Sequence, residues 1–224
     1  MLLFFTPIIF SQYYSQYEQD KFVNELFFHN KKNGFFVDIG AHDGRTYSNT
    51  LFFEESLGWR GICFEPLAEP FTKLVANRPN SFCYNACVSW QKGEQRFFEV
   101  QGYSQMLSGL VDTYDPRHLE RLKKEIKLYG GSYRVIVVPV VQFNEIMQEK
   151  NVQKVDFLSL DTEGSEIEIL KTIDFDAVKI DVIAVENNYL TKDIRDFLIL
   201  KGYHFVIHKG DEIYVHSRLL QNHR

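Results

Sequence analysis

Two apolar runs of strand length end in polar side chains that are suited to acid–base chemistry or to cation binding. The residues that follow these two runs are Asp161, Thr162, Glu163, Glu186, Asn187 and Asn188. Ligands of open α/β sheets bind outside the carboxyl ends of parallel strands. We therefore expect both clusters to face one cleft and to form a functional site there.

These residues fit two kinds of chemistry. Asp161, Glu186 and Asn187 offer oxygen ligands to a hard cation such as Mg²⁺ or Mn²⁺, which would hold and acidify a substrate hydroxyl. Alternatively, Asp161 or Glu163 acts without a metal as a general base that removes the hydroxyl proton. The sequence leaves both alternatives open.

The acids just downstream have a structural explanation. Ser165 and Glu168 match the S-x-x-E capping box, in which each side chain bonds to the other residue's backbone N–H. Glu166 is favourable near the positive end of a helix. We expect these residues to start a helix, which leaves the chemistry to the acids at the strand ends.

A glycine-containing loop, FVDIGAHDG, follows an earlier apolar run. Gly40 ends the predicted strand and Gly44 precedes a helix, so backbone N–H groups there can approach an anionic group of a ligand. Glu65 ends the next strand about twenty residues beyond Gly44, where a carboxylate can bind two ribose hydroxyls. This pairing predicts a ligand that contains a nucleoside.

Two cofactor classes compete for this loop. The dinucleotide fingerprint G-x-G-x-x-G requires a second glycine where this chain has His42, and its third glycine is missing. Asp38 and Asp43 would repel a pyrophosphate, whereas they suit the sulfonium and ammonium groups of S-adenosylmethionine. We favour S-adenosylmethionine. The alternatives are an NAD-dependent oxidoreductase and a cofactor-binding domain without catalytic activity.

The order of the predicted elements indicates a doubly wound α/β fold. Strands are predicted at 34–40, 61–66, 81–89, 154–161 and 179–187, helices at 45–58, 67–79, 165–173 and 191–202, and a closing hairpin at 203–208 and 212–217. Strands that alternate with helices over short connections form a parallel sheet with both faces covered.

An insertion around residues 101–133 interrupts this alternation. Loops on a rigid scaffold often carry binding residues, so we predict substrate contacts from Tyr103, Ser104 and His118. Tyr103 could act as a platform for a sugar ring. His208, on a late strand, is a fourth candidate because it can reach the rim of the cleft.

Several of these motifs resemble one protein family. VDIGAHDG, CFEP, NACVS and VDFLSLDTEGSEIEIL, with YSQYEQDKFV upstream, look like the FkbM family of S-adenosylmethionine-dependent O-methyltransferases, from Ser15 to His216. The resemblance implies a class I methyltransferase fold, a Rossmann-like sheet of seven strands that is mostly parallel with an antiparallel strand in the C-terminal hairpin. It also implies methylation of hydroxyls on sugars, glycans or natural products.

The resemblance also implies roles for individual residues. The implied cofactor contacts are Asp38, Gly40 and Gly44 at the methionine end, Glu65 at the ribose, and Asn85 with Ala86 at the adenine edge. His42 would shape the loop. The acids at the strand ends are similar to those of metal-dependent catechol-type O-methyltransferases, with Glu186 in place of the usual Asp.

Composition limits the remaining possibilities. The 224 residues fit a single domain at 15–224 preceded by an apolar arm at 1–14. A net charge of −5 without basic blocks argues against a nucleic-acid partner, and no segment reaches transmembrane length. Cys63, Cys83 and Cys87 are expected to be reduced, so we predict a cytoplasmic protein. A signal peptide or a membrane contact through residues 1–11 is the alternative.

Overall fold

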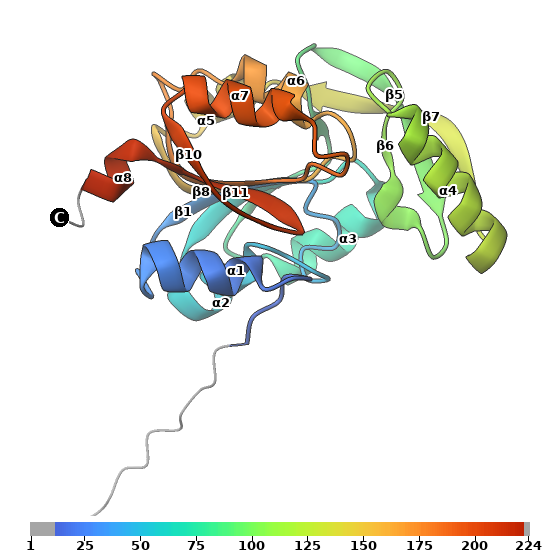
Figure 1. Ribbon diagram of the computed structural model, residues 1–224. Coiled ribbons are helices and arrows are strands. Elements are labelled where there is room, and N and C mark those ends of the chain that lie inside the picture. Colours follow the sequence, from blue (N-terminus) through green and yellow to red (C-terminus); the bar gives the residue numbers. More distant parts are fainter. Residues whose placement is uncertain (1–11, 222–224) are drawn as a thin grey trace, which may run out of the picture.

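A seven-stranded sheet forms the centre of the computed structural model, which describes residues 12–221 (Figure 1). Its strand order is β10-β11-β9-β8-β1-β2-β3. The strands are β1 (Phe35–Ile39), β2 (Arg60–Phe64), β3 (Phe82–Tyr84), β8 (Lys154–Leu160), β9 (Lys179–Val185), β10 (Tyr203–Lys209) and β11 (Asp211–His216). Only β11 runs antiparallel to its neighbours, which confirms the predicted α/β fold with its antiparallel strand in the C-terminal hairpin.

Helices cover both faces of this sheet. On one face lie α1 (Gln19–Val23) with a π-helical turn η1 (Asn24–Phe28), α2 (Leu51–Leu57) and α3 (Ala68–Asn77); on the other lie α5 (Phe143–Glu149), α6 (Glu166–Thr172) and α7 (Lys192–Leu200) (Figure 1). A short helix, α8 (Ser217–Gln221), follows β11. This two-sided cover is the arrangement that a parallel sheet requires.

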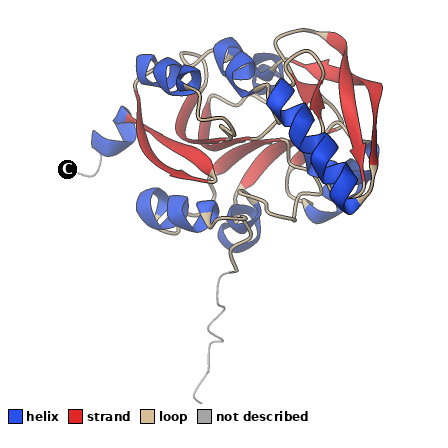
Figure 2. Ribbon diagram, turned by 45° about the vertical axis from the view of Figure 1, so that its right-hand side comes forward, coloured by secondary structure: helices blue, strands red, loops and turns tan. Residues whose placement is uncertain are grey.

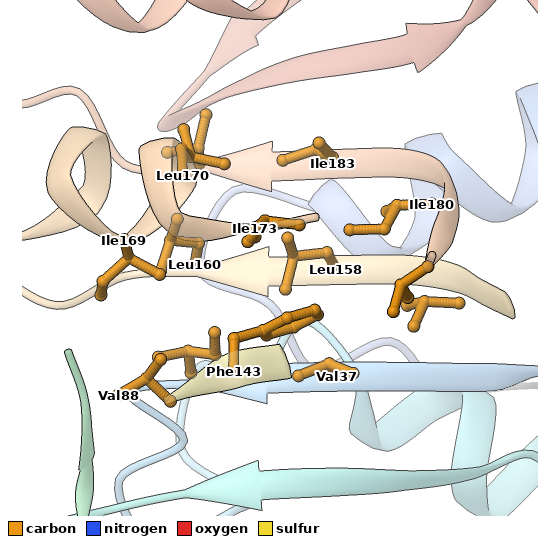
Figure 3. Close-up of a cluster of buried hydrophobic side chains, with 14 of the residues drawn as sticks. Val37, Val88, Phe143, Leu158, Leu160, Ile169, Leu170, Ile173, Ile180 and Ile183 are labelled. Carbon is orange, nitrogen blue, oxygen red and sulfur yellow. The ribbon is translucent and has the colours of Figure 1, made fainter. Parts of the chain in front are cut away.

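The central strands are apolar on both faces because each face packs against a helical layer. On β8, Leu158 and Leu160 join the cluster formed with α5, α6 and α7, part of which Figure 3 shows, whereas Phe157 joins the cluster on the opposite face. Successive side chains of a strand point to opposite faces, so one run of residues supplies both cores. The rigid sheet therefore fixes the positions of the polar residues at its strand ends.

A second, four-stranded sheet lies beside the first (Figure 2). Its strands, in spatial order, are β4 (Cys87–Val88), β7 (Ser132–Val141), β5 (Gly93–Gln101) and β6 (Gly109–Leu110), with the 3₁₀ turn η2 (Gln105–Leu107) and helix α4 (Pro116–Tyr129). This differs from the prediction of one strand at 81–89 and an insertion at 101–133. The side chain of Asn85 bonds to the carbonyls of Glu65 and Pro66, and the chain leaves the main sheet at this point.

Two other expectations concern the chain ends and the cysteines. Most of the arm predicted at 1–14, and all of the signal-peptide alternative at 1–11, lies outside the described residues. Within residues 12–221, no helix combines the length and the apolar character needed to cross a bilayer. Cys63, Cys83 and Cys87 are free thiols, as expected.

Candidate functional site

A cavity of about 670 Å³ opens at the carboxyl ends of β1, β2, β8 and β9. Its size falls in the range of small-molecule sites. Of the candidate residues from the sequence, those that line it are Asp38, Gly40, His42, Glu65, Ala86, Asp161, Glu163, Glu186, Asn187 and His208. Both polar motifs found in the sequence therefore meet in one cavity.

The glycine loop and the acidic strand end touch each other. Gly40 has a φ of +92°, and a Cβ added to it would lie 1.7 Å from the backbone oxygen of Asp161. The N–H of Asp161 donates to the carbonyl of Ile39, which holds the two strand ends together. Gly44 has a different task, because its missing Cβ makes room for Leu74 and Arg78 and the residue does not line the cavity.

Glu65 is fixed at the edge of the cavity by two backbone groups. The N–H of His42 donates to its Oε2 at 3.1 Å, and the N–H of Leu67 donates to its Oε1 at 2.7 Å. Burial raises the pKa of this carboxyl to about 7. Ring atom Nε2 of His42 bonds to Oε1 of Gln105 at 3.1 Å, so the second sheet reaches over the glycine loop at this point.

Asp38 is buried at the carboxyl end of β1. The hydroxyl of Thr50 donates to its Oδ2 at 2.5 Å. Burial raises the pKa of Asp38, whereas the nearby Arg78 guanidinium opposes that rise. Arg78 is 1% exposed and donates to Glu54, Gly44, Ser48 and Thr50, so one buried cation ties the glycine loop to α2.

The two residues that the resemblance implies at the adenine edge, Asn85 and Ala86, differ in whether they line the cavity. Ala86, Cys87 and Val88 line the cavity and offer an apolar wall. Asn85 does not line it, because its amide donates to the carbonyls of Glu65 and Pro66. Asn85 thus shapes the wall and is not positioned to contact a ligand through its side chain.

Three carboxylates converge at the strand ends. Asp161, Glu163 and Glu186 each place one oxygen within 4.8 Å of the others. Glu163 has a φ of 58°, a conformation that side-chain-bearing residues rarely adopt. Burial, and then repulsion from neighbouring carboxylates, raise the pKa of all three groups, that of Asp161 to about 7. Such a cluster is stabilised by a proton or a cation placed between its oxygens.

The ligand set predicted for a metal differs from this cluster in one member. The amide of Asn187 donates to the carbonyl of Thr191 and its Oδ1 accepts from the Thr191 N–H, so both side-chain atoms are used in a local turn. Glu163 occupies the third position. Asn187 lines the cavity, but its side-chain atoms are engaged with Thr191.

Glu166 begins α6, as predicted, and has a further structural role. Its Oε1 accepts from the N–H and the hydroxyl of Thr162 and from the N–H of Gly164, so it braces the turn that carries Glu163. The predicted capping box is wrong. Ser165 makes no cap bond, and its hydroxyl instead contacts that of Thr113 at 2.7 Å.

Helix α4 packs against the acidic turn. His118 is 1% exposed and its Nε2 lies 3.1 Å from Oε2 of Glu163. Burial lowers the pKa of His118 to about 4. Asn188 donates to the same Glu163 oxygen at 3.2 Å, and Arg121, which bonds to Glu125, lines the cavity beside the acids. The insertion therefore contributes to the electrostatics of the site.

The predicted substrate residues are separated by the fold. His208 lines the cavity, whereas Tyr103 packs on Tyr129 away from it and is 73% exposed. Ser104 is buried, donates to Glu125 and does not line the cavity, so the structure does not bring Tyr103 and Ser104 together with the other candidates. His118 contacts Glu163 and not the cavity.

Sequence reasoning missed several residues that line the cavity, among them Tyr17, Tyr47, Asn49 and Asp211. Tyr17 belongs to the motif YSQYEQDKFV, to which no site role was given. Tyr47 and Asn49 lie in the loop between β1 and α2, beyond the glycine motif, and Asp211 falls in the predicted hairpin turn.

Comparison with known families gives one match. The family model described as the methyltransferase FkbM domain matches residues 38–205, which includes the glycine loop, Glu65 and all three clustered acids. No curated protein matches the chain.

Comparison with solved structures finds matches at low sequence identity. A methyltransferase FkbM from Methylobacillus flagellatus KT is 13% identical with a TM-score of 0.49; the match covers 84% of this chain and 44% of that one. A protein in the NADB-Rossmann superfamily from Streptococcus agalactiae is 11% identical, with a TM-score of 0.46 and coverage of 92% and 70%. A TehB-like SAM-dependent methyltransferase from Corynebacterium glutamicum is 10% identical, with a TM-score of 0.42 and coverage of 90% and 86%. The chain thus spans less than half of the first of these proteins.

Proposed function

The chain belongs to the FkbM family of methyltransferases, and from this premise we propose that it transfers a methyl group from S-adenosylmethionine to a hydroxyl of a saccharide, glycan or natural product. The observation that carries the proposal is the contact between the glycine loop and Asp161 within one acidic cavity. A donor held by the loop would therefore lie beside the acids. An oxidoreductase that uses NAD does not agree with the family.

The residues present fit S-adenosylmethionine. Gly40 leaves the loop free of side-chain atoms beside Asp161, and two backbone N–H groups fix the carboxylate of Glu65 at the edge of the cavity, where it could accept from ribose hydroxyls. Asp38 and the clustered acids suit a ligand with two positive groups. Ala86, Cys87 and Val88 offer an apolar wall for a base. When bound, the cofactor supplies a methyl group on a cationic sulfur.

The clustered acids support two versions of the chemical step. In the first, Asp161 accepts the proton of the acceptor hydroxyl as its oxygen attacks the methyl carbon, and a pKa of about 7 suits this task near neutral pH. In the second, Asp161, Glu163 and Glu186 together hold Mg²⁺ or Mn²⁺, which would acidify the hydroxyl. In both versions Glu166 and Asn188 hold Glu163 in place.

The test combines binding with turnover. Isothermal titration should show binding of S-adenosylmethionine and not of NAD, and labelled cofactor should transfer methyl groups to members of a panel of mono- and oligosaccharides. Tight NAD binding would refute the proposal. Binding of S-adenosylmethionine without transfer to any acceptor would instead leave a cofactor-binding domain without activity.

Two further measurements separate the versions of the step. Asp161→Asn should lower kcat by about 100-fold or more while the Kd of S-adenosylmethionine changes little, because a general base contributes about 10²–10⁴ in rate. An unchanged kcat would remove Asp161 from the mechanism. Full activity in a chelator would eliminate the metal version, and loss of activity that Mg²⁺ or Mn²⁺ restores would eliminate the version without a metal.

A further inference from the structure

One wall of the cavity, formed by residues 16–19, 46–49 and 208–211, contains neither the glycine loop nor the clustered acids. Gln19 donates from Nε2 to Oδ2 of Asp211 at 3.2 Å, and Asn49 donates to the same oxygen at 2.9 Å. A β-bridge between Ser15 and Tyr47 adds a further connection. These bonds join three segments that are far apart in the sequence, namely 16–19, 46–49 and 208–211.

Two tyrosines stand at this wall with their rings open to solvent. Tyr17 is 51% exposed and Tyr47 is 54% exposed. A Cβ on Gly210 would lie 2.2 Å from the Tyr17 ring, so the ring rests directly on the backbone of the hairpin turn. Tyr47 has a φ of 58°, which is rare for a residue of its size. Such conformations cluster where side chains are held for binding.

The remainder of the cavity is rich in carboxyl groups and poor in cationic groups. Six carboxylates line it, those of Asp38, Glu65, Asp161, Glu163, Glu186 and Asp211. The basic side chains that line the cavity are two histidines and Arg121, and Arg121 already bonds to Glu125. On the unused wall, Oδ1 of Asn49 is buried and has no partner among the described residues. A ligand here must bring donors or positive charge.

We propose that this wall binds the methyl acceptor, that the acceptor is a neutral or amino-bearing sugar stacked on Tyr17 and Tyr47, and that acidic and phosphorylated sugars are excluded. A sugar ring has an apolar face of C–H groups, which packs on an aromatic ring, and an edge of hydroxyl donors, which suits Asp211 and Asn49. A carboxylate or phosphate on the acceptor would lose water without gaining a free cationic partner among the described residues that line the cavity, which disfavours its binding. This inference rests on the proposed function and narrows its acceptor.

Matched acceptors test the charge rule. For each hexose that accepts labelled methyl, the amino sugar, the uronic acid and the sugar phosphate of the same ring are compared by kcat/KM. The neutral and amino sugars should exceed both anions by about 100-fold or more. Anions that react within about threefold of the neutral sugar would overturn the inference while leaving the methyl-transfer proposal intact. No transfer to any sugar, with S-adenosylmethionine bound, would refute the saccharide acceptor and this inference together.

Variants test the stacking surface. Tyr17→Ala should raise the acceptor KM by about five- to tenfold, with kcat and the Kd of S-adenosylmethionine unchanged, because an aromatic contact contributes about 0.5–1.5 kcal/mol. Tyr17→Phe keeps the ring and should keep the KM. Tyr103→Ala is the matched control, since Tyr103 is exposed but does not line the cavity. An unchanged KM in Tyr17→Ala, or a weaker Kd for the cofactor, would overturn the assignment.

Discussion

Replacement of Gly40 by alanine tests the contact that joins the glycine loop to the acidic strand end. Alanine at a φ of +92° costs about 1–2 kcal/mol. Its Cβ would lie 1.7 Å from the backbone oxygen of Asp161, so one strand end must move, and such overpacking costs about 1–3 kcal/mol more. Gly40→Ala should therefore destabilise the protein by about 2–5 kcal/mol, which lowers Tm by about 5–15 °C in a chain of this size.

Gly93→Ala is the matched control for this experiment. Gly93 has nearly the same φ, +95°, but an added Cβ would meet no atom within 4 Å. Its cost is the conformational part alone, about 1–2 kcal/mol. Thermal unfolding followed by circular dichroism measures both variants without ligand, and titration with S-adenosylmethionine should show weaker binding only for Gly40→Ala. If Gly40→Ala unfolds at the same temperature as Gly93→Ala, the two strand ends do not touch as described.

Three other predictions follow from the buried polar groups. Glu65 has a pKa of about 7 in the folded protein and an ordinary pKa of 4.5, so the folded state binds more protons than the unfolded state between these pH values. The free energy of unfolding should therefore fall as the pH rises through this window. Glu65→Gln should lessen that fall in urea titrations without ligand, and a pH dependence identical to that of the unchanged protein would contradict the prediction. Arg78→Met should destabilise by about 3–5 kcal/mol because Glu54 is left buried and unpaired, and a loss below about 1 kcal/mol in urea unfolding would argue against a buried ion pair. Glu166→Ala should lower both Tm and kcat, because two groups of Thr162 and the N–H of Gly164 lose their acceptor in the turn that carries Glu163. Glu168→Ala loses only an exposed ion pair with Lys171 and should change neither quantity. Equal effects of the two variants would refute the role of Glu166 in bracing the turn.

The main sheet could be predicted because each of its central strands is recognisable from its own sequence. The runs that contain β1, β2, β8 and β9 are apolar, of strand length and bounded by turns, and buried parallel strands need nothing more to be recognised. The second sheet could not, since two of its strands, β4 and β6, have only two residues each. Runs of that length are too short to show the period of a strand.

The site likewise contains residues that could be predicted from the sequence and residues that could not. Asp161, Glu163 and Glu186 were found because strand direction alone brings them to one edge. Asn187 follows the same strand end, but its amide closes a turn with Thr191, a choice that depends on the path of the backbone beyond β9. Tyr17 and Asp211 meet the cavity only through packing between the N-terminal segment and the hairpin.

The pairing of β4 with the end of β7 has a consequence for how the chain tolerates change in length. Cys87 lies opposite Val140 and Val88 opposite Val141, so the segment that leaves the main sheet returns beside its own starting point. Closure of a longer loop between fixed ends adds only about 0.6 kcal/mol for each doubling of its length. Residues between Ser89 and Pro139 can therefore be shortened, extended or exchanged as one block with little penalty to the main sheet. An exchanged block would have to keep the contacts that Gln105 makes with His42 and that His118 makes with Glu163, since these reach the glycine loop and the strand-end acids.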